Sequence, residues 1–432
     1  AAAISALAAA GFGLGPALAA TRPRLAALLA SLNAGAPGGR RRLQRGLVVG
    51  QLALTVLLVA SAGLLLRSFY NLTHVGAGFD ADHVVTFHVG AAWNEDRTKI
   101  AVLQTSLLTQ LQAMPGVAAA GFTNFLPASN ATLQYQIKLA GLAGNGAAGT
   151  YSVGERSISP GYLSALRVPM VAGQDCPAMA RNPQSPGRAL VNRSFVDTYL
   201  RGESVVGRAF RWSQDPPNIP ASQIVGVVDD VRENSLGAAP TPFLYSCIAP
   251  GAWPDPEYVV RTAGDPAATM AALRGVVARV APARAVFGLE RLQNVISTSL
   301  EQPQLDARFL SLFAGFALLL AAVGLYSLMS LLVAGRKREL GVRIALGASR
   351  KQVAKLVLAA TGRLLIWGAL AGLLLTWAAD RLLESLLFGV HPLDALTMAA
   401  TLAVLALIAA AAAWIPARRA AATDPLTALR AD

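Results

Sequence analysis

The sequence predicts a membrane protein: an α-helical bundle of four transmembrane helices, with a large mixed α+β domain between the first and second of them. Three observations predict this fold class. Only 14% of the 432 residues are charged and 54% are hydrophobic, whereas ordinary soluble domains carry about 25% charged residues. The apolar residues gather into four long runs, and arginines cluster at the ends of those runs. The net charge of +13 therefore indicates orientation in a membrane and no nucleic acid partner, which would need a basic face on a soluble domain.

The four apolar runs are long enough to be transmembrane helices, because about 20 mostly apolar residues cross the hydrocarbon core of a bilayer. They cover residues 46–66, 309–334, 356–379 and 396–415. Arg363 lies inside the third run, near the end that carries Lys355, and its long side chain is expected to reach the membrane surface. A buried helix of a soluble fold is the alternative for the fourth run, but its lack of charges and the flanking Arg418 and Arg419 favour a span.

The short loops set the orientation, since lysine and arginine stay on the cytoplasmic side in short loops. Basic residues crowd the linker 21–45, the segment 335–355 and the tail 416–432, whereas the loop 380–395 has a slight acidic excess. We therefore expect the three basic segments in the cytoplasm and that loop outside. Residues 67–308 then form a domain outside the cytoplasm.

Residues 1–20 are also apolar and have two interpretations. One is a signal peptide with a cleavage-like site at 17–19, although no positive charge precedes the apolar stretch. We favour the other, because segment 16–28 is similar to segment 416–429 and internal repeats are considered first. Residues 1–20 are then the remnant of the last transmembrane helix of a preceding, duplicated half.

The domain formed by residues 67–308 has mixed α and β patterns. Extended runs are expected at 83–89, 134–139, 224–228, 243–245 and 258–260, and helices at 98–114, 192–200, 266–280 and 289–300. Ser159 is expected to cap a short helix with Pro160 in its first turn, and Asp265 to cap the helix 266–280. The helix 289–300 should run almost directly into the second span. A polar, proline-containing stretch predicts a subdomain break near 180–187.

The two cysteines, Cys176 and Cys247, both fall in this domain. An exported domain meets an oxidising compartment, which permits a disulfide. Two isolated cysteines are equally compatible with free buried thiols, because a sequence does not show the geometry that a disulfide requires. The pairing is left open. Neither the cysteines nor the four histidines have the spacing of a zinc site, and no metal or cofactor is expected.

The most informative segment is the charged stretch 336–348 between the second and third apolar runs. Glu339 and Arg343 are four residues apart with the acid first, the favourable order for a pair on a helix surface. Leu340 and Ile344 make an apolar stripe one turn apart. The pattern predicts a short amphipathic helix at the membrane surface, a shape that docks in a groove of a partner.

The end of this segment carries helix signals of its own. Gly347 suits the C-terminal cap of the short helix. Ser349 and Gln352 have the spacing of a capping box, which predicts a new helix running into the third span. An ordinary basic loop that only fixes topology is the alternative; it explains the arginines but neither Glu339, Gly347 nor the capping box.

The order of the segment, a basic pair, glutamate, an aliphatic residue and glycine, then arginine, alanine and glycine-alanine, resembles the cytoplasmic coupling segment of FtsX/MacB-type ABC transporter permeases. Further segments, in order over essentially the whole chain, resemble the duplicated acidobacterial-type members of that family (ADOP). They are 47–54, 63–69, 78–80, 115–117, 159–162, Gly173, 192–195, 207–208, 224–231, 386–390 and Asp394. The stretch 174–176 departs from the pattern, since the family tends to have arginine after the glycine.

The resemblance implies an inner-membrane permease subunit with an ABC nucleotide-binding subunit as its partner on the cytoplasmic face. The preceding permease half or a second permease, the lipid membrane and a periplasmic protein are further partners that it implies. It also implies which residues touch the ATPase: Arg336, Arg338, Glu339, Leu340, Gly341, Arg343, Ile344, Gly347 and Ser349. The chain has no Gly-x-x-x-x-Gly-Lys-Ser/Thr loop and is not expected to hydrolyse ATP itself. The expected output is efflux, export or mechanical activation of an outer partner.

Two pairs of glycines lie one helical turn apart in the spans: Gly46 with Gly50, and Gly368 with Gly372. Small residues at this spacing let helices approach closely in a membrane. The pairs either form the contact between permease halves or are glycines tolerated by chance in an apolar run.

Two other functions compete with the permease. A membrane-anchored hydrolase could use Asp229, Asp230 and Glu233, but neighbouring residues of a strand point to opposite faces, and the chain has no Gly-x-Ser-x-Gly. A sensor or scaffold with an outer binding domain and no transport is the second alternative. The coupling segment argues against it.

Overall fold

The computed structural model describes residues 38–140, 150–178, 185–201, 203–334, 342, 349–379, 387–390 and 394–421. The chain divides into two compact units. The membrane unit comprises residues 1–69 and 305–432, and the inserted unit comprises residues 70–304.

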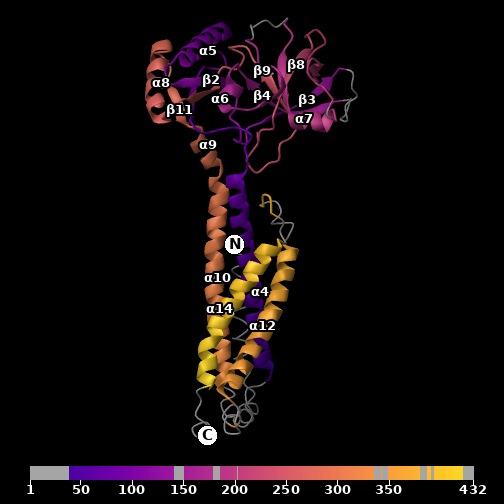
Figure 1. Cartoon of the computed structure of the whole chain (residues 1–432), viewed down its shortest axis with the longest axis vertical. Coiled ribbons are helices and arrows are strands. Elements are labelled where there is room, and N and C mark those ends of the chain that lie inside the picture. The colour runs from indigo at the N-terminus through magenta and orange to yellow at the C-terminus, as the bar shows by residue number, and fades with distance from the viewer. Residues whose placement is uncertain are drawn as a thin grey trace. The chain divides into compact units, whose positions relative to one another are not determined.

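Four of the described helices are long and apolar enough to cross a membrane (Figure 1). They are α4 (Gly38–His74), α10 (Glu301–Ala334), α12 (Arg350–Ala378) and α14 (Ala395–Ala421). Helices α4 and α10 extend past the apolar runs that predicted them, since residues such as Arg, Gln and Leu continue a helix whether or not lipid surrounds it. Residues 38–45, which we expected in a linker, are helical, and so are residues 67–74 and 301–308.

Helix α4 is the most deeply packed helix of the described bundle. Half of its apolar stretch is buried, against 22% for α10 and α12 and 28% for α14. Its core residues Val48, Leu52 and Val56 belong to one apolar cluster with residues of the other three helices. The partners in that cluster include Leu325 and Met329 of α10, Val357 of α12, and Leu405 of α14. Apolar side chains of all four helices thus meet in one core, and α10, α12 and α14 leave other large apolar side chains exposed.

The inserted unit is a mixed α and β structure. Its described strands form one eleven-stranded sheet in the order β11-β1-β10-β2-β4-β3-β7-β8-β6-β9, with β5 paired to β8. The strands are β1 (Val84–Val89), β2 (Val117–Thr123), β3 (Leu133–Leu139), β4 (Tyr151–Ile158), β5 (Met170–Gly173), β6 (Arg188–Asn192), β7 (Ala209–Trp212), β8 (Ser222–Val228), β9 (Phe243–Cys247), β10 (Glu257–Thr262) and β11 (Val286–Arg291). The helices are α5 (Arg97–Gln112), α6 (Tyr162–Leu166), α7 (Arg193–Tyr199), α8 (Pro266–Val280) and α9 (Leu292–Ser299).

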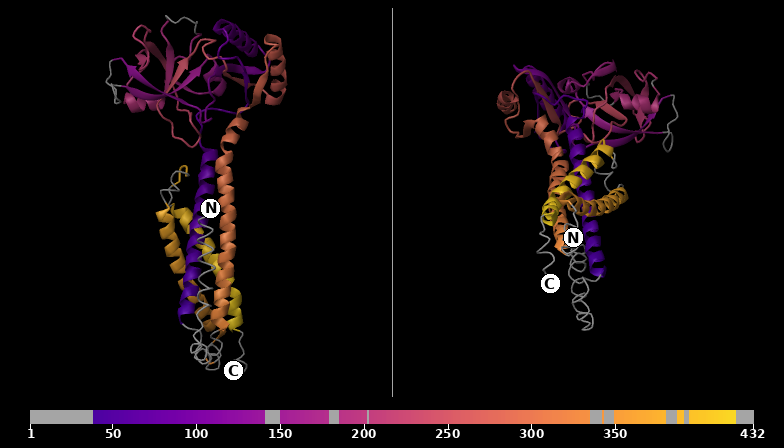
Figure 2. Two further views of the ribbon diagram at one scale, coloured as in Figure 1. Left: turned by 180° about the vertical axis from the view of Figure 1, so that it is seen from behind. Right: turned by 60° about the horizontal axis from the view of Figure 1, so that its bottom comes forward.

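One subdomain is the open antiparallel sheet β11-β1-β10-β2. Helices α5 and α8 lie side by side against it, as Figures 1 and 2 show. Alternate residues of β1 face these helices: Val85 and Phe87 pack with Leu107 of α5 and Leu273 of α8, whereas Val84 belongs to the core on the other face. This alternation is what a strand with two buried faces requires.

The other subdomain is a closed ring of strands. β4 pairs with β3, and the ladder continues through β7, β8, β6 and β9 before β9 pairs again with β4 in parallel. Closing a sheet on itself removes exposed strand edges. The inside of the ring holds a second apolar core that includes Ile137, Val153, Val191 and Ile224.

The subdomain break predicted near 180–187 is wrong. Strands β5 and β6, on either side of that stretch, both pair with β8 and so belong to the same subdomain. The chain leaves the open sheet after β2 and returns to it at β10. A polar stretch with prolines is as typical of a loop as of a domain boundary, and only the strand pairing distinguishes the two.

Two of the predicted caps have different outcomes. Asp265 accepts a hydrogen bond from the N–H of Ala267 at 3.1 Å, and Pro266 opens α8, as predicted. Ser159 does not cap α6: Gly161, with φ of +85°, is its N-cap. The Ser159 hydroxyl instead accepts a hydrogen bond from the N–H of Phe122 in β2 at 2.8 Å. The hydroxyl therefore bonds to the neighbouring strand and not to the first turn of α6.

The helix predicted at 289–300 begins later than expected. Residues up to Arg291 complete β11, which pairs with β1, and α9 starts at Leu292. Only Leu300, in a right-handed helical conformation, separates α9 from α10. The near-continuous helical connection into the second span is therefore present. Residues 289–291, which were predicted to form its first turn, belong to strand β11 instead.

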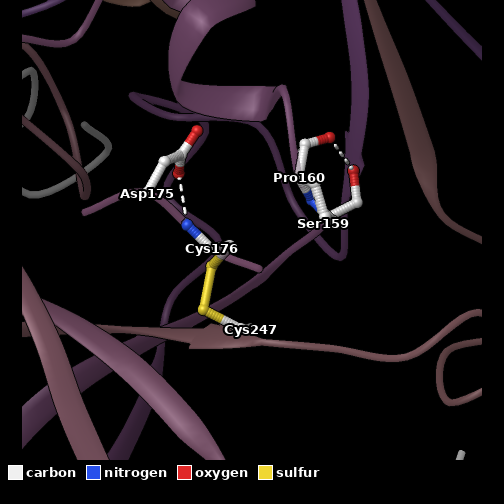
Figure 3. Close-up of a disulfide and its surroundings, with 5 residues drawn as sticks. All are labelled: Ser159, Pro160, Asp175, Cys176 and Cys247. Carbon is white, nitrogen blue, oxygen red and sulfur yellow. Dashed lines mark hydrogen bonds between the residues drawn. A yellow bond between two sulfur atoms is a disulfide. The ribbon is translucent and has the colours of Figure 1, made fainter. Parts of the chain in front are cut away.

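A disulfide joins Cys176, which follows β5, to Cys247 at the end of β9 (Figure 3). Both residues are buried, and the N–H of Cys176 donates to the carboxylate of Asp175 at 2.7 Å. The bond closes a sequence separation of 71 residues, which is worth about 4 kcal/mol in the chain-entropy model. The structure thus resolves the pairing that the sequence left open in favour of a disulfide.

Candidate functional site

The predicted coupling segment is described at its C-terminal end. Ser349 caps α12: its hydroxyl accepts the N–H of Gln352 at 3.4 Å, and the Gln352 side chain accepts the N–H of Ser349 at 2.8 Å. The predicted capping box is therefore confirmed. The other predicted contact residues, Arg336, Arg338, Glu339, Leu340, Gly341, Arg343, Ile344 and Gly347, lie outside the described residues.

The loop that follows α4 is fastened to the core of the inserted unit, and we call this attachment the α4 anchor (Asp80, Asp82, Arg167 and Arg261). Arg261 is buried in β10, and its guanidinium donates to the carbonyl oxygens of Asp80 at 2.6 Å and Asp82 at 2.9 Å. The Asp80 carboxylate receives Arg167 at 2.9 Å and Arg261 at 3.2 Å. An arginine holding two backbone carbonyls and a carboxylate makes this loop an integral part of the sheet.

Electrostatics support the same attachment. Partial burial by itself would raise the pKa of Asp80, but the N–H of Asp82 and the guanidinium groups of Arg261 and Arg167 outweigh burial and lower it. Asp80 is therefore held in its charged form. Next to it, Gly78 has φ of +82° and packs against the backbone of Asp230, where a Cβ would have no room.

The residues leading into α10 are fastened to the same place. Leu292 of α9 is fully buried, and Val295 and Ile296 pack on the core that contains Val84 of β1. The side-chain amide of Gln293 donates to the carboxylate of Asp82, which belongs to the α4 anchor. One small cluster thus holds both the end of α4 and the approach to α10, so a displacement of either helix end acts on the same part of the sheet.

In the membrane unit, glycines set how closely α12 approaches α4. A Cβ on Gly368 would lie 2.5 Å from the Cβ of Leu52, and a Cβ on Gly372 would lie 2.5 Å from the Cβ of Val56. Small residues therefore make a close helix contact here, as predicted for such pairs. This contact is within the chain, and the contact between permease halves stays a prediction. Gly46 and Gly50 have no atom within 4 Å of a Cβ built on them.

Two segments of the family resemblance that are far apart in the sequence, 63–69 and 386–390 with Asp394, contact each other where α4 leaves its apolar run. Arg67 of α4 forms an ion pair with Asp394, which also caps α14 by accepting the N–H of Thr397 at 2.9 Å. The neighbouring Ser68 accepts the N–H of Phe388 at 2.7 Å. The loop before α14 is thus tied to α4.

The acidic residues of the hydrolase alternative each hold part of the fold. The carboxylate of Asp230 accepts hydrogen bonds from the side chain of Asn192 at 2.7 Å and the hydroxyl of Ser194 at 2.7 Å. Asp229 lies 3.6 Å from the Nε of Arg193. Glu233 is buried against a buried arginine. Each of these three carboxylates is engaged in a contact that stabilises the fold. The structure therefore gives no support to a catalytic acid and base pair at these residues.

That buried arginine, Arg156 of β4, lies at the centre of a polar cluster. Its Nη2 is 2.7 Å from Oε2 of Glu233, and the hydroxyl of Tyr245 donates to Oε1 of the same carboxylate at 2.6 Å. Burial alone would lower the pKa of Arg156, but the charge of Glu233 outweighs it and raises the pKa. Burial and the same carboxylate raise the pKa of Tyr245, which stays a donor. The cluster is a charged core contact rather than an exposed site.

Comparison with known proteins finds a family match for residues 311–425. Residues 311–425 match the family model described as FtsX-like permease C-terminal. The match covers most of α10, the predicted coupling segment, α12 and α14. The chain contains an FtsX-like permease domain.

Curated relatives of this chain are named as export proteins. The pyoverdine export ATP-binding/permease protein PvdT of Pseudomonas syringae pv. tomato is 27% identical over 184 residues, which cover 41% of this chain and 27% of that protein. The macrolide export ATP-binding/permease protein MacB of Marinobacter nauticus is 28% identical over 146 residues, covering 34% and 22%. The chain thus spans about a quarter of the length of the curated relatives it matches.

Among solved structures, the inserted unit is similar to the periplasmic region of MacB from Actinobacillus actinomycetemcomitans. That match covers 54% of this chain and 98% of the other, with a TM-score of 0.34 and 13% identity.

The FtsX-like domain confirms the predicted resemblance to FtsX/MacB-type permeases and the predicted fold class. With four candidate spans among its described residues, the chain fits a multi-pass protein of the bacterial inner membrane. The duplicated ADOP subtype stays a prediction.

Sequence reasoning missed the residues that fasten the two long helices to the inserted unit. Asp80 stood in a motif segment, but its partners Arg261 and Arg167 did not, and neither did Gln293, the partner of Asp82. One signal was present: Arg261 continues the apolar run 258–260, and a charge in a buried strand needs a partner. Sequence alone could not name that partner, because Asp80 and Arg261 are separated by 181 residues.

Proposed function

We propose that this chain is the permease subunit of an FtsX/MacB-type ABC transporter. In this proposal a nucleotide-binding subunit docks on the cytoplasmic segment 335–355, and its ATP-driven closure displaces that segment. Helices α4 and α10 pass the displacement to the inserted unit, which lies outside the cytoplasm. The output is efflux, export or mechanical activation of an outer partner.

The single observation that carries the proposal is the family match over residues 311–425, because it includes the segment 335–355 between two spans. The α4 anchor supports the mechanical part. Asp82 accepts a hydrogen bond from Gln293 while its own carbonyl receives Arg261, so the same residues hold both helix ends. A rigid attachment of this kind transmits displacement, whereas a flexible linker would absorb it.

ATP hydrolysis is assigned to the partner. The relatives PvdT and MacB are named ATP-binding/permease proteins, so ATP binding and the permease occur together in those proteins. The arginines of 335–355 and Arg418 and Arg419 after the fourth span favour the cytoplasm for this face. The orientation in turn favours the outside for residues 70–304.

A sensor or scaffold with an outer binding domain is the second candidate. The disulfide Cys176–Cys247 and the closed ring of strands suit a stable exported binding domain as well as a transporter. The two candidates differ in one respect: only the permease requires an ATPase partner.

The test is therefore partnership with an ATPase. The full chain is produced together with ABC ATPases encoded beside it and purified in mild detergent. We expect an ATPase to copurify, and the double variant Glu339→Ala, Arg343→Ala to reduce the copurified ATPase activity by about tenfold. Truncating well-placed interface side chains typically costs more than about 1 kcal/mol, and 1.4 kcal/mol corresponds to a factor of ten.

The matched control removes the same two charge types in the inserted unit. Glu203 and Arg208 form an exposed ion pair with a distance of 2.9 Å, so Glu203→Ala, Arg208→Ala should leave the ATPase activity at the wild-type level. Failure to recover any ATPase in several detergents would favour the sensor or scaffold. An equal loss in both double variants would remove the role assigned to 339 and 343.

A further inference from the structure

The membrane unit contains a cavity that none of the contacts above explains. It has a volume of about 640 Å³ and lies between α4, α10 and α12. This size is in the range of about 300–1,000 Å³ that is usual for small-ligand sites. Most of its wall is apolar and includes Val49, Met329, Leu332, Leu356, Leu364 and Trp367.

Two arginines also line this apolar cavity: Arg45 at the start of the α4 span and Arg363 inside the α12 span. No acidic residue is among the lining residues. Among the ion pairs and hydrogen bonds between residues that the structure describes, neither guanidinium has a partner. A cation within a membrane span ordinarily pairs or lines a functional path. Two like charges on one cavity repel each other unless an anion lies between them.

Gly46 makes the cavity accessible beside Arg45. It lines the cavity, and a Cβ built on it would meet no atom within 4 Å. The glycine therefore leaves open a part of the cavity that the side chain of a larger residue would fill. Gly46 differs in this from Gly368 and Gly372, because residues of α4 occupy the space beside those two glycines.

We propose that this cavity binds one anionic phospholipid of the cytoplasmic leaflet, with its phosphate between Arg45 and Arg363 and an acyl chain along the apolar wall. The apolar wall alone selects no lipid, because lipid tails are as apolar as the side chains they meet. Selection comes from the headgroup, since basic pockets between transmembrane helices on the cytoplasmic side attract anionic headgroups. The inference does not depend on the ATPase partner and would hold equally for a sensor.

The cavity touches the three helices that the permease proposal requires to move. Val49 belongs to α4, Met329 and Leu332 to α10, and Leu356 and Leu364 to α12. A lipid seated here contacts all three, so its headgroup charge would bias how they pack. Charge at the leaflet surface is thereby a natural regulator of this unit.

The test is lipid selectivity of the full chain in vesicles. The purified chain is reconstituted into phosphatidylcholine vesicles containing a trace of chain-labelled phosphatidylglycerol or phosphatidylcholine spin label, and the motionally restricted fraction of each label is measured. We expect the wild type to prefer phosphatidylglycerol by about thirtyfold, since each of the two arginines near a membrane surface contributes about 1 kcal/mol. The variant Arg45→Gln, Arg363→Gln should lose this preference, while excess inorganic phosphate should leave the wild-type preference unchanged.

Matched controls lie on the same helices. Lys355→Gln removes a cation of α12 that does not line the cavity and should keep the preference. Gly46→Trp should fill the cavity and abolish it, whereas Gly50→Trp, one turn further along α4 and equally free of neighbours, should not. The Gly46 variant keeps both arginines, so it tests the cavity even if the double arginine variant is poorly folded.

Three results would overturn the proposal. One is a wild type without headgroup preference, or a preference that survives both Arg45→Gln, Arg363→Gln and Gly46→Trp. Another is displacement by inorganic phosphate, which would mean a site for a free anion. The last is exclusion of both lipids together with a dimer that Gly46→Trp converts to a monomer, which would place a second copy of the chain in the cavity.

Discussion

Glu233→Gln is expected to destabilise the inserted unit by about 3–5 kcal/mol, because it leaves the buried guanidinium of Arg156 without its counter-charge. The side chains of Arg156 and Glu233 are 1% and 4% exposed, so water cannot replace the lost carboxylate. The amide keeps the size of the glutamate and can still accept from Tyr245. The change therefore removes a charge and little else.

Hydrogen exchange of the full chain measures this effect directly, since the slowest amides of β4 and β9 report the free energy of opening. We expect those amides to exchange about a hundredfold faster or more in Glu233→Gln. The control Glu203→Gln disrupts an exposed pair with Arg208 and should cost no more than about 1 kcal/mol. Adding Arg156→Met to Glu233→Gln should cost less than the sum of the two single changes. Exchange in Glu233→Gln as slow as in the control would contradict the role of the buried pair.

Gly372→Leu is expected to separate α12 from α4. A Cβ at this position would lie 2.5 Å from the Cβ of Val56 and 2.9 Å from the backbone oxygen of Ala53. Side chains can rotate away, but a backbone oxygen in the middle of a helix cannot. Overpacking of a tight core typically costs about 1–3 kcal/mol and occasionally more, so we expect a clear fall in the temperature at which the detergent-solubilised chain loses its monodisperse peak.

The control lies on the same helix. A Cβ built on Gly362 would meet no atom within 4 Å, so Gly362→Leu should leave the transition unchanged or raise it slightly, because leucine favours a helix over glycine. If Gly372→Leu and Gly362→Leu have the same transition temperature, the close contact between α12 and α4 does not stabilise the bundle.

Much of the membrane unit could be predicted from the sequence, because the bilayer imposes one length and one composition on each span. The four runs, the capping box at Ser349 and the charge pattern of the loops are all local signals. The extra turns of α4 and α10 were missed, since hydropathy marks where lipid could surround a helix and not where its hydrogen bonding stops. Gly372 was recognised as a contact residue, but its partner in α4 was not visible in the sequence.

The inserted unit was less predictable because its decisive contacts join distant residues. The strands were recognisable from their own alternation, whereas the parallel pairing of β4 with β9 that closes the ring left no local pattern. Glu155 and Arg156 are neighbouring charges in a strand and would ordinarily be placed at the surface, yet both are buried. The anchor formed by Asp80 and Arg261 was missed for the same reason.

The central claim is that ATP binding by a cytoplasmic partner moves α4 and α10 where they enter the inserted unit. Spin labels at Thr73→Cys and Glu301→Cys, exposed positions at the end of α4 and the start of α10, measure the distance between those helix ends, and the two native cysteines are already paired. With the copurified ATPase bound, ATP should produce a measurable shift in the mean of the distance distribution, and Glu339→Ala, Arg343→Ala should abolish the shift. Identical distributions with and without ATP, in a complex that hydrolyses it, would contradict the account.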